Sequence, residues 1–229
     1  MDYLTGGLLE AGRLILACDP EFAGTVAVSL KVSLLSTALA TAAAVPAGIL
    51  VAEVRFPGRQ AVITLLHTLM SLPTVLVGLL LYSFVSRRGP LGELGLLYTQ
   101  TAMVLGQAVL AFPIVAGLVV ASVQGLDRRV RATALSLGAD PGQSFRLLLR
   151  EARYGVLAAV VAGFGRVFAE VGVSMMLGGN IRGYTRNITT AIALETSKGE
   201  FALGIALGLV LLGVALAVNV ALGLLRREA

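Results

Sequence analysis

The feature that most constrains this chain is a series of apolar stretches of about 20 residues or more, separated by short polar segments. About 20 apolar residues in a helix suffice to cross the roughly 30 Å of hydrocarbon in a bilayer. Only 14% of the 229 residues are charged and 57% are hydrophobic, so a soluble fold would lack the polar residues to cover its surface. The sequence predicts an all-α polytopic membrane protein with about five transmembrane helices, over residues 24–52, 60–85, 98–123, 154–178 and 202–225.

The first 22 residues differ from these spans, because their apolar side chains recur at helical spacing and their charged side chains lie on another face. This pattern predicts a short amphipathic helix along the bilayer surface, ending at Asp19-Pro20. Its apolar face contains Leu4, Leu8, Ala11, Leu14 and Ile15. We therefore divide the chain into an N-terminal interfacial helix (residues 1–22) and a transmembrane domain (residues 23–229).

Pro73 lies within the second predicted span and Pro113 within the third. Proline has no backbone N–H and removes one hydrogen bond from a helix. We expect each proline to kink its helix, as membrane-spanning helices tolerate.

The basic residues lie mainly in the short segments between spans. We therefore attribute the net charge of +5 to basic residues that set the orientation of the chain in the membrane, and no nucleic-acid partner is expected. With segment 125–153 inside, ten Lys and Arg fall on the inner side and six on the outer side, which predicts an outside N-terminus and a cytoplasmic C-terminus. The inner ones are Arg55, Arg59, Arg128, Arg129, Arg131, Arg146, Arg150, Arg153, Arg226 and Arg227.

Segment 125–153 is too charged to span a membrane and is predicted to form two short helices. Gly138 can adopt the left-handed conformation that ends the first helix. Asp140 is placed to cap the second helix, with Pro141 at its first position and Gln143 completing a capping box. The segment is therefore expected to be an ordered platform.

The residues of this platform resemble the cytoplasmic signature loop of binding-protein-dependent ABC importer permeases. The resemblance covers Ala132-Thr133-Ala134, Gly138, Asp140-Pro141 and the run from Phe145 to Leu149. It departs from the family pattern at Ala132, where the family has Glu, and at Arg150-Glu151, where the family has Leu-Pro. The resemblance implies docking to an ATPase subunit; the alternative is an amphipathic loop helix that rests on the bilayer or on its own protein. The expected coupling residues are Ala134, Leu135, Gly138, Ala139, Asp140, Pro141, Phe145 and Leu148.

The fourth span contains two ionisable residues, Arg166 and Glu170. Each costs about 2.5–3.5 kcal/mol at the bilayer centre, so the pair should face the protein interior or a wet cavity. Their spacing of four residues places them on one helical face, where they can neutralise each other. A structural brace is favoured over substrate contact, because a carboxylate repels an anion.

The segments after Met175 closely resemble tungstate-type oxyanion permeases, and the similarity covers nearly the whole chain from about residue 20. It is carried by Met175–Arg186, Thr189–Gly199, Ser71–Val75 and Arg88–Gly92. Guanidinium, hydroxyl and amide donors in this region suit a tetrahedral dianion. The alternative is that they order an outer loop and bind lipid headgroups or a partner protein. The candidate pathway or gate residues are Arg166, Glu170, Gly178, Gly179, Asn180, Arg182, Thr185, Arg186 and Thr189.

No phosphate-binding loop of the form G-x-x-x-x-G-K-[ST] occurs, so ATP is expected to be used by a separate cytosolic subunit. One His and one Cys leave no metal cluster or nucleophile–base pair, and no cofactor is expected on this chain. The resemblance implies a homodimer in the bacterial inner membrane, two ATPase subunits and an extracytoplasmic binding protein. Tungstate fits best, with molybdate or another oxyanion as the alternative. An ion-coupled transporter is less favoured, because no inverted repeat is visible.

Overall fold

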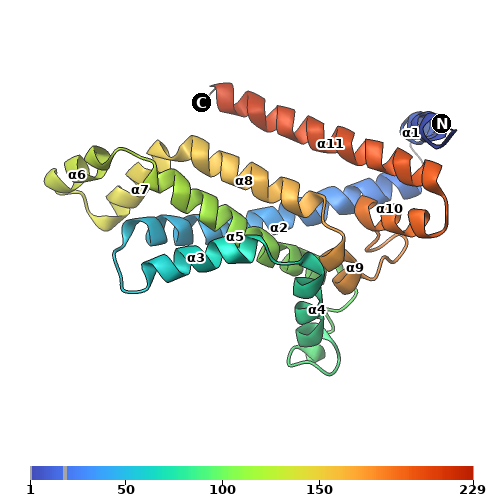
Figure 1. Ribbon diagram of the computed structural model, residues 1–229, viewed down its shortest axis with the longest axis horizontal. Coiled ribbons are helices and arrows are strands. Elements are labelled where there is room, and N and C mark those ends of the chain that lie inside the picture. Colours follow the sequence, from blue (N-terminus) through green and yellow to red (C-terminus); the bar gives the residue numbers. More distant parts are fainter. Residues whose placement is uncertain (1, 18–19, 229) are drawn as a thin grey trace.

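The computed structural model describes residues 2–17 and 20–228, and within these ranges the chain folds into helices joined by turns (Figure 1). The predicted all-α class is confirmed. The helices are α1 (Asp2–Ala17), α2 (Pro20–Glu53), α3 (Arg59–Met70), α4 (Thr74–Val85), the 3-10 turn η1 (Gly92–Leu94), α5 (Gln100–Gln124), α6 (Arg128–Ser136), α7 (Pro141–Glu151), α8 (Arg153–Phe168), α9 (Gly172–Gly178), α10 (Ile188–Ser197) and α11 (Phe201–Glu228).

Three of the described helices, α2, α5 and α11, are long and apolar enough to cross a membrane alone. Two further spans each consist of a bent pair of helices, α3 with α4 and α8 with α9, so the described chain holds five spans when each pair counts as one. In Figure 1, α2, α5 and α8 run along the longest axis of the molecule, while α4 runs across it. The predicted spans therefore correspond to the observed helices, but two of them are broken.

Helix α5 is central and packs against α2, α3, α8 and α9. Its Met103, Ala111, Val115 and Val119 have no exposed surface. The close approach of α2 depends on Gly48, because a Cβ there would lie 2.9 Å from the carbonyl oxygen of Ala116. Small residues at such crossings let the backbones of two membrane helices approach closely, and the helices gain van der Waals contacts.

The two prolines behave differently. Pro73 is the N-cap of α4, and the backbone turns by 100° between α3 and α4, so the predicted kink is in fact a complete break. Proline disfavours helical geometry at the preceding residue, and here Ser71 and Leu72 close the end of α3 with tight bonds to Thr68 and Leu69. Pro113 lies inside α5, which continues from Gln100 to Gln124.

The N-terminal helix α1 lies against α11 through small residues. Ala11 is buried there, and a Cβ on Gly7 would lie 2.6 Å from Cγ2 of Ile205. Leu8 and Ile15 of the predicted apolar face are 62% and 58% exposed. The side chains of Leu4 and Leu14 and the break at residue 19 lie outside the described part. Leu8 and Ile15 are therefore available to lipid, whereas Ala11 of the same predicted face is buried. The interfacial position of α1 stays a prediction.

The helices define two ends of the molecule (Figure 1). Helices α6 and α7 lie at one end, called here the α7 end, and α10 and the start of α2 lie at the other, called the α10 end. The candidate coupling residues and the candidate arginines are thus far apart along the longest axis.

Candidate functional site

The segment from Gly178 to Asn187 forms a compact loop at the α10 end. Gly179, Asn180 and Gly183 have left-handed backbones, with φ of 68°, 52° and 72°. The hydroxyl of the fully buried Thr185 donates to the carbonyl oxygen of Gly178 at 2.6 Å and accepts from the Ile181 N–H at 3.0 Å. Thr185 is therefore committed to folding the loop rather than to holding an anion.

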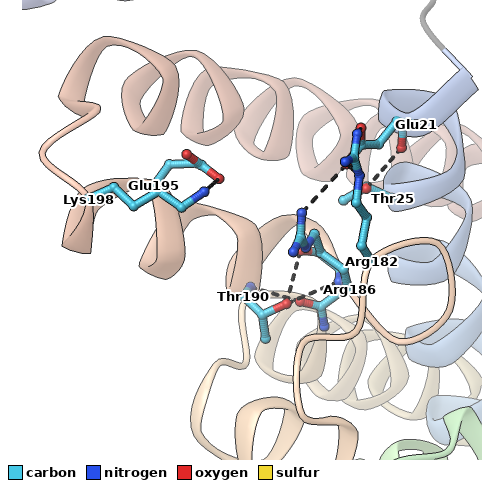
Figure 2. A network of polar contacts seen from close by, with 8 residues as sticks. Glu21, Thr25, Arg182, Arg186, Thr190, Glu195 and Lys198 are labelled. Atoms are coloured by element: carbon cyan, nitrogen blue, oxygen red, sulfur yellow. Dashed lines mark hydrogen bonds and ion pairs between the residues drawn. The ribbon is translucent and has the colours of Figure 1, made fainter.

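The loop presents its two arginines to Glu21, in the first turn of α2 (Figure 2). Arg182 makes a bidentate contact, in which Nε donates to Oε1 at 2.6 Å and Nη2 pairs with Oε2. Arg186 adds an ion pair of 3.5 Å between Nη1 and Oε1. The predicted pair of guanidinium groups is thus brought together, and the group that lies between them is itself an anion.

The two arginines differ in environment. The side chain of Arg182 is 72% exposed, whereas that of Arg186 is 19% exposed. The Nε of Arg186 is buried and has no hydrogen-bond partner among the described residues. The two cations and one carboxylate give 2 − 1 = +1, so this cluster of three side chains keeps a net positive charge. It can attract an anion.

Arg166 and Glu170 form a separate cluster at the break between α8 and α9, where the chain bends by 59°. Glu170 is 2% exposed, and its carboxylate accepts from Arg166 Nη1 and from the Val173 N–H, both at 3.1 Å. A helix break leaves N–H groups without partners, and Glu170 supplies one acceptor at the start of α9. This geometry agrees with the structural brace that the sequence favoured.

The start of α10 is tied to the same break and to α2. Asn187 caps α10 in a capping box with Thr190. The Ile188 N–H donates to Ser29 Oγ at 2.8 Å. The hydroxyl of Thr189 lies 2.8 Å from the carbonyl oxygen of Glu170 and can donate to it. Thr189 therefore belongs with Glu170, apart from Arg182 and Arg186.

Sequence reasoning missed a buried polar contact between three helices. Gln107 of α5 is 1% exposed and donates from Nε2 to Ser174 Oγ at 2.9 Å, while Ser36 donates to Gln107 Oε1 at 3.2 Å. The signal was present, because Gln107 is a lone amide in an apolar span. A side chain of this kind in a membrane interior needs partners.

Sequence reasoning also missed Tyr98, which packs against the start of the Gly178–Asn187 loop. It has a φ of 63°, and its N–H donates to the Leu177 carbonyl oxygen at 2.8 Å. Its ring lies against Gly179, where a Cβ would approach Cδ1 of Tyr98 to 2.6 Å. A hydrogen bond with Tyr82 raises the pKa of the Tyr98 hydroxyl.

The platform at the α7 end has the predicted local structure. Gly138 has a φ of 79°, and the Ala139 N–H closes α6 by donating to the Ala134 carbonyl oxygen at 3.0 Å. The capping box of Asp140 and Gln143 at the start of α7 is confirmed, with bonds of 2.8 and 3.0 Å. The side chain of Leu135 lies outside the described part.

Leu148 anchors the platform to the membrane-spanning helices. It is 4% exposed and lies in the same apolar cluster as Ile49, Leu66 and Val123, with Phe145 packed beside it. A polar pocket of about 650 Å³ lies next to it, between the ends of α2 and α5 and the start of α3, and Ala132 lines this pocket. A movement of α7 would therefore be transmitted to α2, α3 and α5 through packed side chains.

No group of three or more His, Cys, Asp or Glu side chains able to hold a metal ion occurs within residues 2–17 and 20–228. The chemistry that the described side chains offer is anion contact at the α10 end and helix packing at the α7 end.

These features define a multi-pass membrane protein with a helical platform on one side. The model of the family of binding-protein-dependent transport system inner membrane components matches residues 44–228, and the chain belongs to this family. It is 39% identical over 228 residues to the tungstate uptake system permease protein of Peptoclostridium acidaminophilum, covering 100% of both chains. It is also 39% identical over 219 residues to that of Campylobacter jejuni (96% of this chain, 92% of the relative). The molybdenum transport system permease protein of Escherichia coli K12 is 32% identical over 196 residues (80% and 83%).

Proposed function

We propose that the chain is the permease subunit of an ATP-driven importer that moves an oxyanion, tungstate, across the bacterial inner membrane. The observation that carries the proposal is the 39% identity over the full length of a tungstate permease. The positively charged loop at the α10 end supports an anionic substrate. The lower identity to a molybdenum permease makes molybdate the second candidate.

In this proposal, a separate cytosolic ATPase docks on the α6–α7 platform, and an extracytoplasmic binding protein delivers the anion at the α10 end. The contact surface consists of the exposed side of α7 and the Gly138 hinge, while Leu148 faces the core. Ala132 offers no carboxylate to the ATPase, so docking depends on shape and apolar contact. The N-terminus is placed outside and the C-terminus inside.

A second copy of the chain completes the pathway. Helix α4 packs against α9 through Gly78, where a Cβ would lie 3.2 Å from Met176 and Val173. Five other apolar side chains of α4 are exposed, and the helix runs across the long helices (Figure 1). We place the second copy against this face of α4. Its residues are Val75, Leu76, Leu79, Leu80 and Phe84.

Arg182 and Arg186 are proposed to receive the anion at the outer mouth, with the backbone of Gly178, Gly179 and Asn180 shaping the loop. Their guanidinium groups provide paired donors for oxyanion oxygens. Arg166 and Glu170 are assigned a supporting role, because the buried carboxylate caps α9 and repels an anion.

Transport in proteoliposomes tests the proposal. The chain is reconstituted with an ATPase and a binding protein of a tungstate system. Uptake of tungstate is then measured with ATP supplied on the side of the membrane that carries the ATPase. We expect uptake to need ATP and both partners and to be unaffected by collapse of ion gradients. Uptake driven by an ion gradient without ATP would instead assign a secondary transporter, and uptake of molybdate alone would change the substrate.

A further inference from the structure

The carboxylate between the two outer arginines supports a further inference, which rests on the proposed oxyanion transport. We propose that Glu21 is an internal competitor for the transported anion: it occupies the Arg182–Arg186 site until an oxyanion displaces it. The site then has two mutually exclusive occupants, one belonging to α2 and one arriving from outside.

The geometry of the contact is that of an anion site in its occupied form. Glu21 presents two oxygens to Nε and Nη2 of Arg182, the arrangement in which guanidinium groups bind carboxylates and oxyanions alike. It reaches Arg186 only through Nη1, at 3.5 Å. A separation of 3.5 Å is longer than a charge-assisted hydrogen bond, so the carboxylate satisfies Arg182 more fully than Arg186.

The charges favour a dianion as the other occupant. Two guanidinium groups and one carboxylate leave +1, whereas two guanidinium groups and a dianion sum to zero. Glu21 is 36% exposed and Arg182 is 72% exposed, so the ion pair is screened by solvent and can be displaced.

Mutual exclusion lowers the apparent affinity of every external anion by the same factor. For a pair of this exposure we expect a factor of about two to five. Abundant monovalent anions, which gain less from two cations, then stay off the site, and a tightly bound dianion still enters. Glu21 thereby sets the threshold at which an anion occupies the outer mouth.

Direct binding measurements on the full-length chain in lipid nanodiscs test this. Glu21→Gln removes the competing charge and keeps the side-chain length, so it should bind tungstate about two- to fivefold more tightly than the wild type. Glu151→Gln is the control: this exposed carboxylate is the last residue of α7, at the opposite end of the molecule, and its loss should leave tungstate affinity unchanged. Equal or weaker binding by Glu21→Gln, or no binding by either protein, would overturn the inference.

A second measurement keeps Glu21 in place. In Arg182→Lys, a carbodiimide can join the Glu21 carboxylate to the introduced amine as an amide, detected by mass spectrometry. Tungstate should suppress this cross-link with increasing concentration, and chloride at the same concentrations should not. Cross-linking that only the purified binding protein suppresses would make the arginines a docking surface and overturn the inference. Wild-type uptake of tungstate in the transport assay, alongside either negative result, would leave the proposed function intact.

Discussion

Two of the polar contacts described above join residues that are distant in sequence. Glu21 and Arg182 are 161 positions apart, and Gln107 and Ser174 are 67 apart. The Arg166–Glu170 pair was predictable, because four residues separate its members on one helix. The partner of the outer arginines was not, because no local rule links the first turn of α2 to a loop that follows α9. Local spacing therefore predicts contacts between residues of one helix, whereas tertiary packing determines contacts between distant segments.

The buried carboxylate of Glu170 leads to a prediction about folding. Glu170→Gln keeps an oxygen for the Val173 N–H but leaves Arg166 without its counter-charge, which should cost about 1–3 kcal/mol. Adding Arg166→Gln removes the stranded charge, so the double variant should recover part of the folding yield. Yield after membrane extraction and thermal stability in detergent measure both. Equal losses in the single and double variants would indicate that the two residues act independently.

The outer arginines lead to a prediction about transport. Replacing Arg182 and Arg186 together by Gln keeps polarity and much of the bulk while removing two charges from the α10 end. Charge-assisted hydrogen bonds contribute about 1.5–3 kcal/mol each, so tungstate uptake should fall by about tenfold or more. The assay holds binding protein and ATPase saturating, and basal ATP hydrolysis serves as the control. Uptake at the wild-type rate would make these arginines structural.

At the scale of elements, the sequence predicted best where the determinants are local. The helices of the platform follow from Gly138, Asp140 and Gln143, whose hydrogen bonds close within a few residues. The long spans follow from apolar length. The bends of 100° and 59° could not be predicted, because the direction in which a broken helix continues depends on the neighbours that it meets. The packing of α4 on α9 through Gly78 is such a neighbour effect.

The hinge of the platform leads to a prediction about coupling. A Cβ at Gly138 meets no atom within 4 Å, so the effect of a substitution there is conformational rather than steric. Gly138→Leu must hold a φ of 79°, which costs about 1–2 kcal/mol and shifts α7 relative to α6. ATP-driven uptake should fall while membrane insertion stays normal. Gly138→Asn is the control, since asparagine tolerates left-handed geometry and should retain most uptake. Normal transport by Gly138→Leu would show that the platform does not couple to the ATPase.

At the scale of the whole molecule, the two ends have different chemistry. The α7 end carries the platform and most of the basic loop residues, and the α10 end carries the arginine pair, the capped start of α10 and the contact between α1 and α11. If each bent pair is one span, the five spans are predicted to place the chain termini on opposite sides of the membrane. The prediction that the α7 end faces the cytoplasm rests on the charge bias alone. A measurement of the orientation therefore tests the arrangement of the whole molecule.

Cysteine labelling in intact cells tests that orientation. In a Cys18→Ser background, which removes the single native cysteine, Ser136→Cys reports on the end of α6 and Glu200→Cys reports on the turn between α10 and α11. Both positions are exposed, and Glu200 avoids the left-handed backbone of Gly199, whose φ is 87°. With the α7 end inside, a membrane-impermeant maleimide should label Glu200→Cys in cells and Ser136→Cys only after the membrane is opened, because the basic loops are retained on the cytoplasmic side. A permeant maleimide is the control for reactivity and should label both variants. Labelling of both positions from outside would remove the five-span arrangement, and the reverse pattern would invert it and detach the platform from any cytosolic ATPase.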